Sequence, residues 1–146
     1  MEKYFKRQLR VLLEQGRFDP NDQTDRNLLA FVFIPVIQKE MDIFRETVWN
    51  SHRIRKQKDA QLPKGGPNHV YNFPENYGAE DCGWPVSEES LREAAEISGV
   101  LEEGNDYLPP EVREECERII PEVDSVKPRD AADTYLFLKA HFNVQH

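Results

Sequence analysis

The chain has 146 residues, and its 27 Asp and Glu outnumber its 19 Lys and Arg, so the formal net charge is −8. This length fits one domain around one hydrophobic core. No stretch approaches the roughly 20 apolar residues of a membrane span, and the N-terminus lacks the apolar segment of a secretory signal. The two cysteines, Cys82 and Cys116, are too few for a disulfide framework. We therefore expect a soluble intracellular protein.

The charge is unevenly divided along the sequence. Residues 1–73 carry 13 basic and 9 acidic side chains, whereas residues 74–146 carry 6 and 18. The densest basic run lies at residues 51–58. Its cationic side chains are Arg53, Arg55, Lys56 and Lys58. Such a run predicts contact with nucleic-acid phosphates, because each cation can neutralise a phosphate and release a counterion. The alternative is a solvated helix end, where the helix dipole favours basic side chains.

The first element is predicted to be an amphipathic helix over residues 3–15, because its apolar residues recur at helical spacing. Gly16 follows at the position where a left-handed residue often ends a helix. Residues 19–25 have the composition of a turn. Thr24 or Asp25 is expected to cap the next helix by accepting hydrogen bonds from its free N–H groups.

A second helix is predicted from residue 27 to about residue 49. It begins with an apolar run over residues 28–34, which could also be a buried strand, but the later apolar spacing favours a helix. Pro35 removes one hydrogen bond, so we expect either one kinked helix or two consecutive helices. The apolar face of this element includes Phe31, Phe33, Ile37 and Phe44.

Proline, glycine and asparagine then predict an irregular segment up to residue 86. Its aromatic residues favour a long ordered loop that packs onto a folded body. Three short helices are predicted after it, over residues 87–99, 110–120 and 130–142. The last helix would bury Ala132, Tyr135, Leu136 and Leu138. The expected fold is therefore mostly α, a helical domain with one long ordered loop rich in Pro, Gly and aromatic residues.

Common catalytic and cofactor motifs are missing from the sequence, including glycine-rich phosphate loops, zinc-protease motifs and nucleophile elbows. His52 and His69 are seventeen residues apart, and neither has a cysteine or a second histidine close by in the sequence. This spacing does not suit a metal site, so we expect no metal and no cofactor. Cys116 lies among three glutamates, which would raise the pKa of its thiol and disfavour a nucleophilic role.

Residues 28–46 and the following Trp-Asn-x-His-x-x-Arg pattern at residues 49–55 resemble the end of an integrase core domain. This domain is found in animal transposon-derived proteins that are similar to retroviral-type integrases and DDE transposases. The helix end at residues 12–16 and the Pro- and Gly-rich stretch at residues 62–68 are similar too. The resemblance covers just over half of the chain, and the Trp-Asn-x-His-x-x-Arg pattern is its most specific part.

The resemblance implies a division into an integrase-core-like region, residues 1–80, and an acidic helical tail, residues 81–146. In the complete enzymes, three carboxylates on a ribonuclease-H-like sheet and a following helix hold two metal ions for phosphoryl transfer. Those carboxylates lie upstream of the matched region, and Glu2 is a poor match to the third of them. We therefore expect neither the ribonuclease-H-like sheet nor enzymatic activity.

The leading expectation is a non-catalytic, transposon-derived fragment of an integrase core that binds DNA or RNA. Its phosphate contacts would be Arg53, Arg55, Lys56 and Lys58. Trp49, Asn50 and His52 would order this segment, or else form an ordinary packed helix end with a satisfied hydrogen bond. Nucleic-acid binding would place the protein in the nucleus.

Two other hypotheses remain open from the sequence. The chain could be a protein-interaction or self-associating helical module with no nucleic-acid role, in which the apolar helix face meets a protein partner or a second copy. Alternatively, the acidic tail could cover the basic run within the same molecule.

Overall fold

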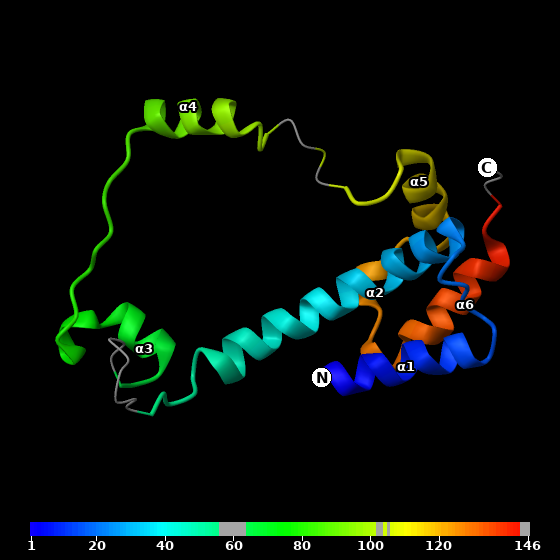
Figure 1. Cartoon of the computed structure of the whole chain (residues 1–146), viewed down its shortest axis with the longest axis horizontal. Coiled ribbons are helices and arrows are strands. Elements are labelled where there is room, and N and C mark those ends of the chain that lie inside the picture. The colour runs from blue at the N-terminus through cyan, green and yellow to red at the C-terminus, as the bar shows by residue number, and fades with distance from the viewer. Residues whose placement is uncertain (56–63, 102–103, 105, 144–146) are drawn as a thin grey trace. The chain divides into compact units, whose positions relative to one another are not determined.

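The computed structural model describes residues 1–55, 64–101, 104 and 106–143. Within these residues the regular structure is helical and contains no strand, which confirms the mostly-α prediction. The α-helices are α1 (Glu2–Glu14), α2 (Gln23–Phe44), α3 (Pro67–Asn72), α4 (Glu88–Ser98), α5 (Pro110–Ile119) and α6 (Ala131–His141) (Figure 1). Shorter elements are a π-helix (Arg45–Trp49) and 3₁₀ helices at Pro74–Tyr77, Val123–Ser125 and Pro128–Asp130. None of the helices in the described ranges is long and apolar enough to cross a membrane.

The chain packs as two units. Unit 1 consists of Met1–Asp42 together with Leu108–His146, and unit 2 consists of Ile43–Tyr107. The first and last parts of the sequence therefore fold together. The sequence suggests a different division, into an integrase-core-like region up to residue 80 and an acidic tail after it. This division is based on family resemblance and charge, and it stays a prediction.

The end of α1 follows the local signals of the sequence. Gly16 has a φ of 67°, a backbone conformation in the left-handed region that favours glycine. Its N–H donates to the Leu13 carbonyl at 3.1 Å, and the Arg17 N–H donates to the Leu12 carbonyl at 3.0 Å. These two hydrogen bonds form the Schellman motif, which satisfies carbonyl groups that the helix itself leaves unpaired.

The start of α2 differs from the prediction, because neither Thr24 nor Asp25 caps it. The helix begins at Gln23, and the Asp22 carboxylate accepts a hydrogen bond from the Thr24 N–H at 2.8 Å. Asp22 is therefore the capping residue. The helix then continues through Pro35 to Phe44 as one element, which excludes both the strand and the pair of consecutive helices.

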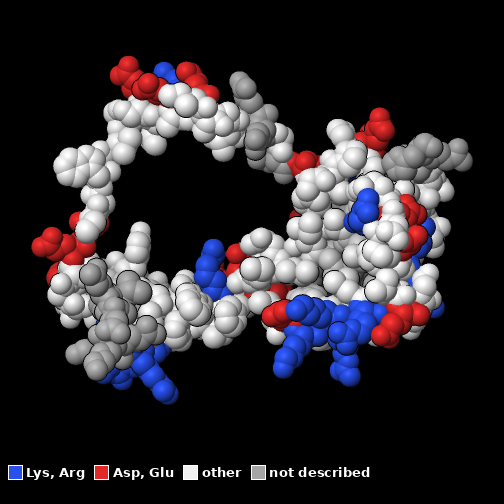
Figure 2. All heavy atoms as spheres, viewed as in Figure 1, with Lys and Arg blue, Asp and Glu red and all other residues white. Residues whose placement is uncertain are grey.

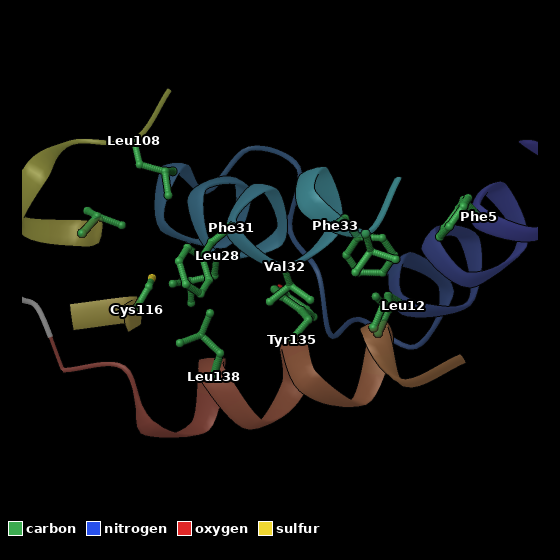
Figure 3. Close-up of a cluster of buried hydrophobic side chains, with 13 residues drawn as sticks. Phe5, Leu12, Leu28, Phe31, Val32, Phe33, Leu108, Cys116, Tyr135 and Leu138 are labelled. Atoms are coloured by element: carbon green, nitrogen blue, oxygen red, sulfur yellow. The ribbon is translucent and has the colours of Figure 1, made fainter. Parts of the chain in front are cut away.

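The hydrophobic core of unit 1 combines side chains from α1, α2, α5 and α6 (Figure 3). Its buried members are Phe5, Leu12, Leu28, Phe31, Val32, Phe33, Val36, Leu108, Val112, Cys116, Ala131, Tyr135 and Leu138. Phe31 and Phe33 are 0% and 3% exposed, so the prediction that they belong to a face open to a partner is wrong. The reason is that α1 and the C-terminal helices pack over this part of α2. Ile37 is partly buried against the core, and Phe44 is 44% exposed.

A polar group is buried beside this core. The Asp25 carboxylate, 4% exposed as a residue, accepts hydrogen bonds from the Asp19 N–H at 2.9 Å and from Lys139 Nζ at 2.8 Å. Lys139 Nζ also donates to the Arg17 carbonyl at 2.8 Å. The Tyr135 hydroxyl donates to the same carbonyl at 3.2 Å. These bonds tie α6 to the connection between α1 and α2.

The two cysteines have opposite environments. Cys82 is exposed, whereas Cys116 on α5 is 0% exposed in the core of unit 1. Burial raises the pKa of the Cys116 thiol to about 11, and the neighbouring Glu115 and Glu117 carboxylates add smaller contributions in the same direction. The predicted direction is therefore confirmed, although loss of hydration is a larger cause than the acidic neighbours. A thiol with this pKa is protonated and a poor nucleophile at neutral pH.

Unit 2 contains more regular structure than the predicted loop. Both α3 and the 3₁₀ helix Pro74–Tyr77 lie in the segment that the sequence suggested was irregular. Tyr71 and Trp84 are 86% and 87% exposed, so the expectation that the aromatic residues of this segment pack onto a folded body is wrong for these two. Farther along, α4 has the predicted ends: the Ser87 hydroxyl accepts from the Ser90 N–H, and Gly99 is left-handed.

Candidate nucleic-acid interface

The basic segment is held at its base by backbone hydrogen bonds. The Ile54 N–H donates to the Gly65 carbonyl at 3.0 Å, and the Asn68 N–H donates to the Asn50 carbonyl at 2.8 Å. Gly65 has a φ of 157°, and the ring of Tyr77 lies 2.7 Å from the position that a Cβ atom would occupy there. A side chain at residue 65 would therefore clash with this ring. The two hydrogen bonds bring residues 50–54 alongside residues 65–68.

Trp49, Asn50 and His52 lie at the beginning of this segment and make hydrogen bonds or ring contacts there. The Trp49 and His52 rings lie 4.6 Å apart between centroids, and His52 Nδ1 is hydrogen-bonded to the Trp49 carbonyl. Asn50 contributes its backbone carbonyl to the Asn68 N–H. Trp49 remains 54% exposed, so the end of the π-helix presents an indole ring to solvent.

We call residues 50–55 the pinned segment, because backbone hydrogen bonds hold them against residues 65–68. Within this segment Arg53 and Arg55 lie on either side of Ile54, and both are exposed. Lys64 precedes Gly65, the hydrogen-bond partner of Ile54, and it is also exposed. Lys56 and Lys58, the other two predicted phosphate contacts, lie outside the described residues. Of the four cations that the sequence singles out, the structure thus places two, on a segment whose backbone is held by hydrogen bonds.

Comparison with known protein families gives a match over the front part of the chain. Residues 1–70 match a family model described as Integrase core domain. Over these residues the chain is integrase-core-like. The matched integrase-core-like region includes α1, α2 and the segment with Arg53 and Arg55, which confirms the resemblance read from the sequence. No curated protein and no solved structure matches the chain.

The integrase-core-like region has a second basic surface, on α1, that sequence reasoning missed. Its members are Lys3, Lys6, Arg7 and Arg10. All four side chains are exposed, and Figure 2 shows Lys and Arg gathered over this helix. They recur at intervals of three and four residues, which places them on one side of a helix. The spacing of these four residues is visible in the sequence. Counting basic residues in a continuous run does not reveal them, because they come together only on one side of the folded helix.

Two acidic residues of α1 lie on or beside this face, Glu2 and Glu14, and Glu2 forms an ion pair with Lys6. The hydrogen bond from Lys6 lowers the pKa of the Glu2 carboxyl below its ordinary value. In the described ranges, no group of three or more His, Cys, Asp or Glu side chains is arranged to hold a metal ion.

Proposed function

We propose that this integrase-core-like chain is a non-catalytic, transposon-derived protein that binds nucleic acid, with Arg53 and Arg55 as phosphate contacts. The observation that carries the proposal is the pinned segment, in which two exposed guanidinium groups flank a residue that is already hydrogen-bonded to Gly65. Because the backbone is ordered before binding, less conformational entropy is lost when the phosphates are engaged. Guanidinium groups also suit phosphate oxygens, to which they can donate two parallel hydrogen bonds.

Other features of the chain agree with this role. The basic face of α1 offers further cations for a phosphate backbone, and Trp49 presents an exposed ring close to the pinned segment in sequence. Such combinations of cations and exposed aromatic rings are typical of proteins that bind nucleic acid. The proposal includes a nuclear location, where DNA would be available to the protein.

Replacing both Arg53 and Arg55 by Ala should weaken binding of the full chain to a labelled 20-base-pair duplex. Because each lost phosphate contact removes about 0.9 from the slope of log K against log salt, the slope should become shallower by about 2. The measurement is fluorescence anisotropy at several salt concentrations.

The matched control is the double replacement of Arg92 and Arg129, two exposed arginines outside the segment, by Ala. This control should leave the slope unchanged. If the wild-type chain shows no binding at about 50 mM salt, or a slope near zero, the proposed function is wrong.

The non-catalytic part of the proposal has its own test. It is supported by Glu2, whose carboxylate is engaged with Lys6 and exposed to solvent. Incubation of the chain with labelled DNA and Mg²⁺ or Mn²⁺ should produce neither cleaved nor joined strands. Metal-dependent cleavage that is lost in a Glu2→Gln variant would contradict this part of the proposal.

A second candidate function, self-association, is favoured by the exposed side of α2 and the π-helix. Met41, Phe44 and Val48 follow one another at spacings of three and four residues, and they are 52%, 44% and 50% exposed. Such spacing forms a continuous apolar stripe that a second copy of the chain could cover. Light scattering decides this candidate, since a dimer that Met41→Glu dissociates would support it and a monomer at all concentrations would exclude it.

A further inference from the structure

A cavity of about 320 Å³ lies in unit 2 beside the pinned segment. Its walls include Asn50, Ser51, Asn68, His69, Asn72 and Phe73. The residues at its walls carry three side-chain amides, one hydroxyl and two rings, and none of the described residues that line it is acidic. Its volume is at the lower end of the range for small-ligand pockets.

The amides are arranged so that some of their hydrogen-bonding groups are engaged and others remain available. Asn72 Nδ2 donates to the Asn68 backbone carbonyl at 2.9 Å and to Asn68 Oδ1 at 3.3 Å. These bonds hold both side chains in place and leave the Asn72 oxygen as an acceptor and the Asn68 Nδ2 as a donor. A single asparagine reads the edge of adenine with its own amide oxygen and nitrogen. Here two neighbouring asparagines supply an acceptor and a donor of the same kinds.

The rings of the cavity are also held in position. The His69 and Phe73 ring centroids are 5.0 Å apart, and His69 Nδ1 is hydrogen-bonded to the Tyr77 hydroxyl. Phe73 remains 51% exposed, so part of its ring is open to a ligand. An aromatic side chain of this kind stacks on any base, because every base has a π-face.

We propose that this cavity holds one unpaired nucleobase, so that the chain prefers single-stranded to duplex nucleic acid. The inference rests on the proposed function, since Arg53 and Arg55 would contact the phosphates while the cavity takes the base. Arg53 follows Asn50 by three residues, which span at most about 10 Å, so both sites are within reach of one or two nucleotides. In a duplex the bases are stacked and paired, so a base cannot enter the cavity and its edge cannot contact the short asparagine side chains there.

The test measures anisotropy of the full chain with a labelled single strand of 15 nucleotides and with the duplex of the same sequence. The wild type should bind the single strand about tenfold more tightly, which corresponds to one stacked base. Phe73→Leu should lower the single-strand affinity about tenfold and leave the duplex affinity unchanged. Tyr71→Leu, at an exposed ring outside the cavity on α3, the helix that Phe73 follows directly, is the matched control and should change neither affinity.

A second pair of variants keeps the inference testable if Phe73→Leu fails to fold by circular dichroism. Asn72→Ala should reduce single-strand binding, whereas Asn76→Ala, at an exposed asparagine outside the cavity, should not. DNA and RNA strands of matched sequence should lose affinity equally, because the base is common to both. A loss confined to RNA would overturn base recognition and indicate contacts to the 2′-hydroxyl.

The failure of this inference and the failure of the proposed function give different results. If the Arg53 and Arg55 variant weakens binding to single strands and duplexes alike while Phe73→Leu behaves as Tyr71→Leu does, the base site is wrong and the phosphate-binding function stands. If the wild type binds neither nucleic acid, both are wrong. Equal affinity of the wild type for single strand and duplex overturns the base site alone.

Discussion

Replacement of Phe31 by Ala should lower the free energy of unfolding of unit 1 by about 3–5 kcal/mol, as is usual for a large aromatic side chain removed from a core. Phe31 is 0% exposed and is surrounded by the core that α2 shares with α5 and α6 (Figure 3). The Arg113 guanidinium carbon also lies 5.4 Å from the Phe31 ring centroid, a cation–π contact that the substitution would remove.

The measurement is urea unfolding followed by far-UV circular dichroism. Tryptophan fluorescence is less suitable, because Trp49 and Trp84 both belong to unit 2. Phe137→Ala on α6 is the control, since Phe137 is 51% exposed and its loss should cost about 0.5 kcal/mol or less. Equal costs for the two substitutions would contradict the packing of the C-terminal helices over α2.

Replacement of Asp25 by Ala should destabilise unit 1 by about 3 kcal/mol, the lower end of the range for breaking a buried ion pair. The lower end applies because Lys139 is partly exposed, with a side-chain exposure of 37% against 6% for Asp25. The substitution removes the acceptor of both Lys139 Nζ and the Asp19 N–H. The ammonium group is then left without its carboxylate, and a backbone donor is left unsatisfied.

Asp22→Ala provides a matched comparison in the same unfolding assay, because this substitution removes only a helix cap and should cost about 1 kcal/mol. The double variant Asp25→Leu with Lys139→Met should cost less than the sum of its single changes, because no charge then lacks its partner. If Asp22→Ala were the more damaging of the two aspartate substitutions, Asp25 would act as a cap and not as an anchor for α6.

The contrast between these two aspartates shows where sequence reasoning succeeds. Helix α1 and its glycine end, the Ser87 and Gly99 ends of α4, and the approximate limits of α5 and α6 depend on neighbouring residues and were predicted correctly. The capping residue of α2 is harder to predict, because a shift of a few residues in the start of the helix changes which aspartate caps it. The partner of Asp25 lies 114 residues away, and no local pattern indicates it.

The same division applies to the burial of α2 and to the candidate site. Periodicity identified the apolar face of α2 but not what covers it, since α5 and α6 come more than 60 residues later. Composition identified Arg53 and Arg55, while the hydrogen bond between Ile54 and Gly65 depends on the fold. The cavity could not be predicted at all, because it requires Asn50 to lie beside Asn68 and Asn72, across a segment rich in glycine and proline.

The arrangement of unit 1 has a consequence for the folding of the protein during its synthesis on the ribosome. About 100 residues separate Phe31 from Leu138, so at about 5–20 residues per second the apolar side of α2 emerges roughly 5–20 s before the helix that covers it. During this interval chaperones can bind α2, and it can also associate wrongly with other nascent chains. Unit 2 draws its packing from one uninterrupted stretch of sequence, and so it can fold in the meantime. The middle of this chain can therefore reach its final structure before either of its ends.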